Sequence, residues 1–451
     1  MSKIQKLALP TDENRSIPRT QCTGPSRQDL KIVIVNRNYP PGAGVTGESA
    51  CRLARYLETH NNAQVTVVSC RSEYAGGGSQ LAPEGDVRMI RSLYDGKNKV
   101  LRLLSTFVES YLLIKTARSL NPDRVIVMTD PPFLQFWAPR LLSGKCPWTL
   151  WSMDLYPDAF VSSKLVKPNN LIYRILKHWT YRKAPDSLLA LGPLQSEHLK
   201  TAYQEPIESS AVVPCGVYAK PEQLPPEPAW KKDNAGKILL GYCGNLGEAH
   251  SVEFLKQVID HFDPKRFHLV LSVYGVKAQE ILRHAQSRKE KITIVPSVER
   301  DQLSFIDIHL VSLKKNWAHV CVPSKAVSAI CSGSPILLYG SPDCDNWKML
   351  GFGGWLIRQS SDRNEVSKAV SNFLNSVDHK TIESKKLDAA SVAAVLREMV
   401  DFGYFQVARN LGLTDTTKTS ERPTAAPTPI PKANIAGSLP TLPKLGELVK
   451  D

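Results

Sequence analysis

The sequence predicts an α/β fold in which two doubly wound, Rossmann-like domains face each other across a cleft. The chain has 451 residues, whereas single hydrophobic cores stop growing at roughly 250–300 residues. From residue 30 onward, short runs of β-branched residues alternate with longer helical patterns, which is typical of β-α-β units that build a parallel sheet. A proline-rich stretch, residues 214–237, divides this alternation into two series. We therefore interpret it as a linker between two domains.

The first series predicts a domain over residues 29–213. Its expected strands are Lys31 to Val35, Val65 to Ser69, Val87 to Ile90, Arg124 to Met128, Trp148 to Trp151 and Ser187 to Leu191. Two segments repeat apolar residues at helical spacing and predict helices packed on that sheet: Glu48 to His60 and Val100 to Ser119. Residues 1–28 are polar, hold three prolines and are expected to form a disordered tail.

The second series predicts a domain of the same architecture over residues 238–413. Its expected strands are Ile238 to Tyr242, His268 to Val273, Ile292 to Val295, Ile306 to Leu313, Ile336 to Tyr339 and Trp355 to Ile357. Its expected helices are Val252 to Phe262, Glu280 to Ala285, Ser324 to Cys331 and Glu365 to Leu374. Residues 414–451 are rich in Thr, Pro, Ala and Lys. They cannot bury enough apolar area to offset the cost of ordering, so we expect a second disordered tail.

Composition excludes several classes of protein. Apolar residues make up 42% and charged residues 22% of the chain, close to the averages of globular proteins. No apolar run reaches the roughly 18 residues that a membrane-spanning helix needs. Residues 1–28 lack the apolar core of a secretory signal, so we expect a cytoplasmic protein. The nine cysteines form no C-x-x-C pair, so we expect neither a metal site nor a disulfide framework.

Positive charge is concentrated in the first half of the chain. The net charge is +14, and residues 1–200 hold 27 Lys and Arg against 16 Asp and Glu, whereas residues 201–451 hold 30 against 27. Nucleic acid, anionic lipid headgroups and phosphorylated substrates all suit such a surface, as does a basic surface that only aids solubility. Charge alone does not choose among them.

The loops that follow the strands are the candidate sites, because ligands of doubly wound sheets bind beyond the carboxyl ends of the strands. The first such loop holds Gly42, Gly44, Thr46 and Gly47. Its glycines match the dinucleotide-binding pattern G-x-G-x-x-G, but six residues separate them from the strand. Arg71 stands where an acidic ribose ligand is expected. The loop therefore has three possible roles: it binds NADP in an oxidoreductase, it lines the cleft between the domains, or it is a plain turn from strand to helix.

The loop after the strand Trp148 to Trp151 places Asp154 among aromatic residues, Tyr156 and Phe160. Aromatic rings stack on the faces of sugars, and a carboxylate accepts hydrogen bonds or a proton from a sugar hydroxyl. This loop is therefore a candidate sugar-binding loop. An Asp that caps a helix beside packed aromatic side chains explains the same residues.

The strand Ile238 to Tyr242 runs into a second candidate loop, followed by a helix. The loop holds Gly244, Asn245, Gly247 and His250. Free backbone N–H groups and the positive end of the helix dipole make such a loop suitable for a diphosphate. A routine loop between a strand and a helix is the alternative.

The helix Ser324 to Cys331 suggests a further anion site. Lys325 lies in its first turn, where a cation opposes the helix dipole. A lysine at this position is explained if its ammonium and the N-terminal amides of the helix hold a phosphate together. An exposed lysine without a role is the alternative.

Together, these motifs resemble the family 4 glycosyltransferases of GT-B fold, and are most similar to members that build bacterial envelope polysaccharides. The resemblance rests on residues 31–36 with the glycine-rich loop, Trp151-Ser-Met-Asp-Leu-Tyr-Pro-Asp158, Tyr242-Cys-Gly-Asn-Leu-Gly-x-Ala-His250 and Val322-Pro-Ser-Lys-x7-Gly-x-Pro335. It spans roughly Lys31 to Leu374, with four motifs in the order and domain that the family has.

The resemblance implies an acceptor domain, followed by a domain that binds a nucleoside diphosphate sugar, and transfer with retention of configuration. It implies no obligate metal and no permanently bound cofactor, because protein cations and helix dipoles neutralise the leaving diphosphate. Carried over by position, the donor-binding residues are Gly244, Asn245, Gly247, His250, Ser324, Lys325 and Asp345. Lys325 would contact the departing oxygen and Asp154 would orient the acceptor or take its proton, so these two are the candidate catalytic residues.

Two carboxylates of the family are missing from this chain. Many members place two glutamates eight positions apart, where this chain has Val320 and Ser328. The branch with the Pro-Ser-Lys helix has an acidic residue soon after the next strand, where this chain offers Asp343 and Asp345. We take Asp345 as the candidate for contact with the donor.

One cation of the family is also missing, since Glu248 stands where related chains often have arginine. Lys314, Lys315 or His250 would have to replace it. A catalytically degenerate binding protein is therefore an alternative to an active enzyme.

The sequence thus predicts an enzyme that transfers a hexose from a nucleoside diphosphate sugar, with a UDP-sugar as first choice. The acceptor would be a polysaccharide or a lipid-linked sugar in envelope or extracellular polysaccharide biosynthesis, and no nucleic-acid partner is expected. The basic first half, with Lys97, Lys99 and Arg102, would contact anionic lipid at the inner face of the plasma membrane. A helix packed on the core explains the apolar residues beside these cations equally well.

Overall fold

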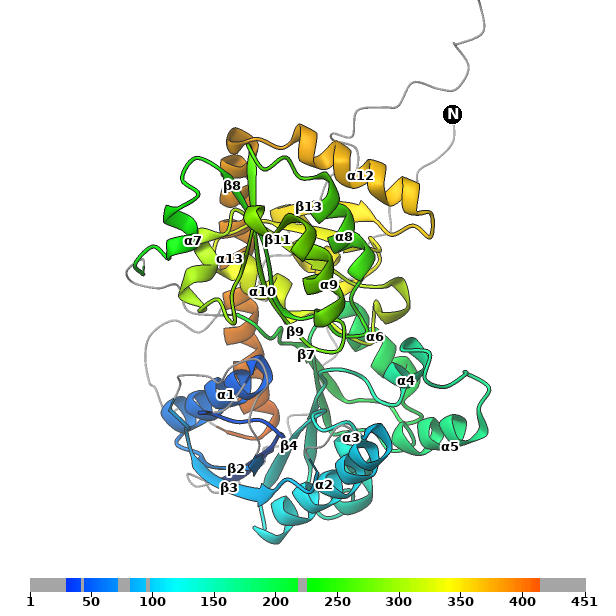
Figure 1. The fold of residues 1–451 in the computed structure, drawn as a ribbon. Coiled ribbons are helices and arrows are strands. Elements are labelled where there is room, and N and C mark those ends of the chain that lie inside the picture. The colour runs from blue at the N-terminus through cyan, green and yellow to red at the C-terminus, as the bar shows by residue number, and fades with distance from the viewer. Residues whose placement is uncertain (1–29, 42–43, 72–81, 95–97, 218–224, 414–451) are drawn as a thin grey trace, which may run out of the picture.

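A computed structural model describes residues 30–41, 44–71, 82–94, 98–217 and 225–413. These residues form two α/β domains, the first in the lower and the second in the upper half of Figure 1. The tails expected at 1–28 and 414–451 lie outside the described residues, as do Gly42 and Lys97. None of the described helices is both long and apolar enough to cross a membrane.

The first domain is built on a seven-stranded parallel sheet in the order β3-β2-β1-β4-β5-β6-β7. Its strands are β1 (Lys31–Val35), β2 (Gln64–Arg71), β3 (Asp86–Arg91), β4 (Arg124–Met128), β5 (Trp148–Trp151), β6 (Ser187–Ala190) and β7 (Ser209–Val212). The first six confirm the predicted strands to within a few residues. The prediction missed β7, an edge strand of four residues of which two are serines, because it shows no apolar run.

Helices cover this sheet and connect its strands. They are α1 (Val45–Asn61), α2 (Lys99–Ser119), α3 (Leu134–Leu141), α4 (Asp158–Ser162), α5 (Leu171–Thr180) and α6 (Pro193–Ala202). The prediction found α1 and α2 and missed the four shorter helices, which have 5 to 10 residues each. Helices this short show too few turns for their apolar period to be recognised.

The second domain is built on a six-stranded parallel sheet in the order β10-β9-β8-β11-β12-β13. Its strands are β8 (Ile238–Asn245), β9 (Phe267–Tyr274), β10 (Ile292–Ile294), β11 (Ile308–Ser312), β12 (Ile336–Gly340) and β13 (Gly354–Arg358). Its helices are α8 (Val252–His261), α9 (Ala278–Ala285), α10 (Ser324–Cys331), α11 (Asp345–Leu350) and α12 (Arg363–Ser376), with 3₁₀ helices η1 (Gln286–Lys291), η2 (Asp301–Phe305), η3 (Lys315–Trp317) and η4 (Gly351–Gly353). All six strands were predicted. The described part of the linker contains a short helix, α7 (Ala229–Lys232).

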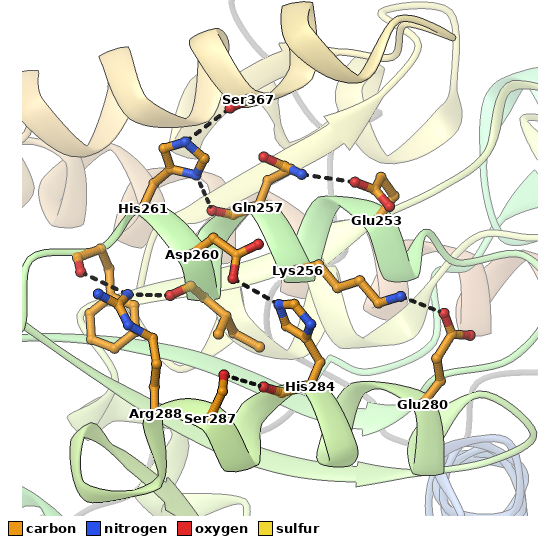
Figure 2. Close-up of polar contacts among 12 residues, drawn as sticks. Glu253, Lys256, Gln257, Asp260, His261, Glu280, His284, Ser287, Arg288 and Ser367 are labelled. Carbon is orange, nitrogen blue, oxygen red and sulfur yellow. Dashed lines mark hydrogen bonds and ion pairs between the residues drawn. The ribbon is translucent and has the colours of Figure 1, made fainter.

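Polar contacts join the helices on the outer face of the second domain (Figure 2). They link Lys256 to Glu280, Asp260 to His284 and His261 to Ser367. These contacts tie α8 to α9 and to α12 and are largely exposed to solvent. Exposed pairs of this kind contribute about 0–1 kcal/mol each, so we assign this face to packing rather than to catalysis.

The last helix, α13 (His379–Asn410), has 32 residues and joins the two domains. It packs against α10 and η4 of the second domain and against β7 and α1 of the first, and Figure 1 shows it running from one domain to the other. Gly403 allows the close approach, because a Cβ there would lie 2.4 Å from Cγ2 of Val213. The end of the segment 238–413 is therefore packed on the first sheet.

The strand order reverses once in each sheet, between β1 and β4 in the first and between β8 and β11 in the second. Such a reversal separates the two loops that leave the adjacent strand ends and opens a crevice between them. Loops from both reversals line one cleft between the domains. The fold thus places the loops singled out in the sequence at the site expected for a ligand.

Candidate functional site

The cleft between the two domains has a volume of about 470 Å³. Eight of the predicted site residues line it, namely Gly44, Thr46, Asp154, Gly244, Asn245, His250, Ser324 and Lys325. Two domains contribute to this lining, so the cleft brings together residues up to about 280 positions apart in the sequence.

Lys325 lies in the first turn of α10 and points to the loop after β8. Its Nζ donates hydrogen bonds to Oη of Tyr242 and to the carbonyl oxygen of Asn245, both at 2.6 Å. The same ammonium lies 4.2 Å from the centre of the Tyr242 ring. Burial lowers the pKa of Lys325 from 10.5 to about 7, although the Cys321 and Cys243 thiols act in the opposite direction. No carboxylate among the residues that the structure describes pairs with it, so an anion in the cleft would be its natural partner.

The end of β8 and the neighbouring loop each contain a glycine with positive φ. Gly244 has φ of 120° and Gly275, in the neighbouring loop after β9, has φ of 101°. A Cβ on Gly275 would lie 2.0 Å from Oδ1 of Asn245, so the absence of a side chain there leaves room for Asn245. Gly247 lies behind Asn245 and is not among the residues that line the cleft.

His250 closes this loop as a neutral ring. Its Nδ1 contacts the carbonyl oxygen of Ser312, and burial beside Lys325 lowers the pKa of His250 well below its ordinary value. A carbonyl only accepts, so Nδ1 carries the proton and Nε2 is free to accept. His250 therefore does not replace the missing family cation, contrary to one of our expectations.

The lysines Lys277 and Lys314 hold the loop from its other side. Both donate to the carbonyl oxygen of Glu248, at 3.2 and 2.9 Å, and Lys277 also pairs with the Glu248 carboxylate at 3.1 Å. Burial and the neighbouring Lys277 lower the pKa of Lys314 to about 8. Neither lysine lines the cleft, nor does Lys315, which lies in η3. Lys277 and Lys314 instead hold the backbone of the loop. Lys325 is the lysine in the cleft lining.

Two carboxylates of the first domain line the cleft, and only Asp154 was predicted from the sequence. Asp130 follows β4, and its Oδ2 accepts a hydrogen bond from Nδ2 of Asn38 at 2.6 Å. Burial raises the pKa of Asp130 to about 6; Arg37 acts against this rise and Asp154 adds to it. Burial also raises the pKa of Asp154, which the Cys321 thiol partly offsets by a hydrogen bond. A carboxyl group whose pKa lies near neutrality suits proton transfer.

The glycine-rich loop of the first domain contributes Gly44 and Thr46 to the cleft. Gly44 precedes the first turn of α1, and Gly47 is buried inside that helix rather than in the cleft lining. Glu48, also buried, accepts a hydrogen bond from Nε of Arg300 in the second domain at 3.0 Å. This ion pair joins the two domains at the rim of the cleft.

Asp345 does not contact the cleft, which corrects the expected contact with the donor. Its side chain is fully buried, and its two oxygens accept hydrogen bonds from the backbone N–H groups of Leu194 and Gln195 at 2.7 and 3.0 Å. Burial raises its pKa to about 6, and those two N–H groups lower it in part. The position after β12 was predicted correctly, but α11 turns the carboxylate toward α6 of the first domain.

The cleft is also lined by residues that were not predicted from the sequence as site residues. Asn38, Asp130 and Arg300 line it. Asp130 could have been found, since it lies two residues after a predicted strand next to the reversal of the strand order. Arg300 could not, because it precedes a short 3₁₀ helix and its place in the cleft depends on how the two domains are arranged.

Comparisons with known proteins agree with this architecture. No protein-family model matches the chain. Among curated proteins, the probable glycosyltransferase WbjE of Pseudomonas aeruginosa is 25% identical over 278 residues, which cover 57% of this chain and 68% of WbjE.

Solved structures resemble nearly the whole described chain. WaaG, a glycosyltransferase involved in lipopolysaccharide biosynthesis, has a TM-score of 0.61 at 14% identity and covers 83% of this chain and 99% of its own. Sucrose-phosphate synthase from Thermosynechococcus elongatus has a TM-score of 0.63 at 13% identity and covers 85% and 99%. HepE of Anabaena, solved in complex with UDP and glucose, has a TM-score of 0.57 at 13% identity and the same coverage.

These neighbours confirm the predicted fold, two parallel-sheet domains around a cleft, and the curated relative agrees with the motifs that suggested the activity. The resemblance to family 4 is compatible with them. The chain is a glycosyltransferase of the GT-B fold.

Proposed function

We propose that this enzyme transfers a hexose from a nucleoside diphosphate sugar, with a UDP-sugar as first choice, to a lipid-linked or oligosaccharide acceptor. Transfer retains the anomeric configuration and serves envelope or extracellular polysaccharide synthesis. The observation that carries the proposal is the half-buried Lys325, which lines one cleft with Asp154 and Asp130 and pairs with no carboxylate among the described residues. The complex of HepE with UDP and glucose supports the choice of donor class.

On the donor side, the diphosphate would lie between the loop after β8 and the start of α10. The backbone around Gly244, the N-terminal amides of α10 and the Lys325 ammonium all favour negative charge there. These groups would stabilise the leaving diphosphate, so the proposal includes no obligate metal and no bound cofactor.

On the acceptor side, Asp154 or Asp130 would accept a hydrogen bond or a proton from the attacking hydroxyl. Both line the cleft from the first domain, and burial raises the pKa of each. Asn38 holds Asp130 in place. This arrangement suits an acceptor that enters from the first domain.

The proposal predicts that UDP stabilises the protein more than GDP, ADP or NADP. A thermal-shift assay with each ligand measures this, since a ligand at 100 times its dissociation constant adds about 2.7 kcal/mol of stability. A response to NADP alone contradicts the proposal and favours the oxidoreductase. Binding of UDP without transfer or hydrolysis of any UDP-sugar identifies a degenerate enzyme instead.

We also propose a peripheral contact with an anionic membrane at the cytoplasmic face, through one surface of the first domain. Twelve of the fifteen large apolar side chains that are exposed among the described residues lie between Met89 and Trp179. Nine of them are on two helices: Val100, Leu101, Leu103, Leu104 and Val108 on α2, and Leu171, Ile172, Ile175 and Trp179 on α5. We call these nine residues the α2–α5 surface.

Charge favours a membrane over a protein partner for the α2–α5 surface. Residues 159–185, which include α5, hold six Lys and Arg and no Asp or Glu. Figure 1 shows α2, α3 and α5 in the same lower part of the first domain, and α3 packs against both of the others. Exposed apolar side chains beside cations bind anionic bilayers, and each cation near the surface adds about 1 kcal/mol.

Replacing Ile172 by glutamate should weaken binding to vesicles that contain phosphatidylglycerol by about tenfold or more, because it removes an apolar contact and adds a repelled charge. Co-flotation of the full chain measures this. Leu387→Glu is the matched control, since Leu387 on α13 is 73% exposed, close to the 76% of Ile172. Equal loss in both variants, or a dimer that only Ile172→Glu disrupts, contradicts membrane contact through this surface.

A further inference from the structure

Asp345 and Asn346, the first residues of α11, lie behind the cleft and contact both of its walls. Both side chains are fully buried. The helix α11 packs against α6 of the first domain and α10 of the second. The pair therefore lies where the acceptor side and the donor side of the cleft meet.

Asp345 caps α6 from the other domain. Its oxygens accept from the N–H groups of Leu194 and Gln195, while Gly192, the residue at the N-cap position of α6, offers no side chain. A Cβ on Gly192 would lie 2.3 Å from Cγ of Asp345, so the glycine leaves room for the carboxylate. A carboxylate at a helix N-terminus satisfies free amides and is favoured by the helix dipole.

Gln195 connects the cap of α6 to the loop that holds Asp154. Its side chain is fully buried; Oε1 accepts from Oγ of Ser152 at 2.9 Å and Nε2 donates to the carbonyl oxygen of Met153 at 2.8 Å. These two residues immediately precede Asp154. Asp345 thus reaches the backbone that orients Asp154 through one intermediate side chain.

Asn346 makes the matching contact on the donor side. Its Nδ2 donates to the carbonyl oxygen of Pro323 at 3.1 Å. Pro323 is the residue before α10, whose first turn holds Ser324 and Lys325. Two adjacent residues of α11 are therefore connected to the two sets of groups that would act on acceptor and donor.

We propose that Asp345 and Asn346 are positioning residues that fix Asp154 and Lys325 relative to each other across the cleft. Asp345 acts through Gln195 on the loop of Asp154, and Asn346 acts through Pro323 on the start of α10. The roles of Asp154 and Lys325 rest on the proposed function, whereas the connections can be tested without it.

Hydrogen exchange of backbone amides tests the connections directly. In Asp345→Asn, exchange should rise about tenfold or more at Met153 and Leu155, because the loop before Asp154 loses its support. These amides are suitable reporters, since they donate to Oγ1 of Thr129 and to the carbonyl oxygen of Val320. An increase confined to Leu194 and Gln195 means a local helix cap and overturns the proposal.

Asn346→Leu tests the second connection. It keeps the branched shape of the side chain but removes the bond to Pro323, so exchange should rise at Ala326, whose amide donates to the carbonyl oxygen of Pro323. The amide of Met153 should not change. The matched control for Asp345→Asn is Asp343→Asn, which makes the same chemical change on an exposed side chain two residues earlier. Unchanged exchange at Ala326 overturns this half of the proposal.

Turnover separates positioning from a structural role. With UDP-glucose as the probe, Asp345→Asn should lower kcat about 10²-fold, the loss expected when reacting groups are displaced by about 1 Å, while the Kd for UDP changes less than about threefold. Asp343→Asn should match the wild type. Wild-type kcat in Asp345→Asn overturns the positioning role.

Failure of the proposed function can be distinguished from failure of the positioning role. If the wild type neither binds UDP nor turns over UDP-glucose, the proposed function fails, and the exchange measurements still decide the connections. If Asp345→Asn does not fold, Gln195→Met takes its place, because it keeps the cap of α6 and removes the side-chain contacts to Ser152, to Met153 and to the backbone N–H of Leu191. The same loss of kcat is expected from it, and wild-type kcat overturns the proposal.

Discussion

Replacing Lys325 by alanine lowers the rate of transfer or donor hydrolysis by about 10²- to 10³-fold, the loss typical when one group that stabilises a developing negative charge is removed. The side chain is half-buried, pairs with no carboxylate in the described part of the chain, and is held by Tyr242 and Asn245 in the wall of the cleft. It would neutralise the charge that forms when the diphosphate leaves. Steady-state kinetics with a UDP-sugar, together with UDP affinity by calorimetry, measure the loss.

The matched control is Lys315→Ala, because Lys315 lies ten residues earlier in the same domain and outside the cleft lining. It should leave both the rate and the UDP affinity unchanged. An equal effect of the two substitutions would mean that general charge, rather than the position of Lys325, governs the reaction. Unchanged turnover in Lys325→Ala would remove Lys325 from the site.

The pKa of Lys325 also predicts how the affinity for UDP depends on pH. Its pKa in the free protein is about 7, and a bound diphosphate would raise it, so binding above pH 7 takes up a proton. The affinity for UDP should therefore fall by up to about tenfold per pH unit above pH 7. Calorimetry in buffers of different ionisation enthalpy detects the proton, and Lys325→Ala should show neither the uptake nor the pH dependence.

The lowered pKa of Lys325 also affects how the free energy of unfolding depends on pH. The effect has the opposite sign to that of a lysine whose pKa is raised by an ion pair. The folded-state pKa of about 7 lies below the ordinary value of 10.5, so between these values the unfolded chain binds a proton that the folded chain does not. The contribution of this group to the free energy of unfolding therefore rises with pH from about 7 to 10.5. The affinity for UDP should therefore fall with pH while the free energy of unfolding of the free protein rises. One pH series that measures both quantities separates the two effects.

The sequence predicted the features that depend on local patterns. The twelve predicted strands occur because their apolar runs are short, β-branched and bounded by loops. Asp154, Asn245 at the end of β8 and Lys325 at the start of α10 line the cleft, because parallel strands bring their carboxyl ends to one edge of each sheet.

The features that the sequence did not predict depend on how the two domains meet. Asp345 follows the predicted strand, but only the position of α6 in the other domain shows that its carboxylate caps a helix. Arg300 reaches Glu48 across 252 positions of sequence. The helix α13 is a different case, since Leu396, Val400 and Tyr404 repeat at four-residue spacing and are buried. This period was visible, and the alanines and glycine on the same stripe made it weak.

Replacing Tyr404 by alanine lowers the free energy of unfolding by about 3–5 kcal/mol, the usual cost of removing a large buried aromatic side chain. Tyr404 lies near the end of α13 and is 6% exposed. Its ring packs against Tyr56 of α1 and Trp151 of β5, with centroids 5.5 and 6.3 Å apart. The substitution therefore leaves a cavity where the last helix meets the first domain, and urea unfolding measures the loss.

Two variants isolate this packing from other effects. Tyr404→Phe keeps the ring and loses only the hydrogen bond from its hydroxyl to the carbonyl oxygen of Ser49, 3.4 Å long, so it should cost about 1 kcal/mol or less. Leu387→Ala changes an exposed residue of the same helix and should stay within about 0.5 kcal/mol of the wild type. Because α13 begins on the second domain, a large loss in Tyr404→Ala alone would show that this helix holds the two domains together. A loss no larger than that of Leu387→Ala would show that the end of α13 does not support the first domain.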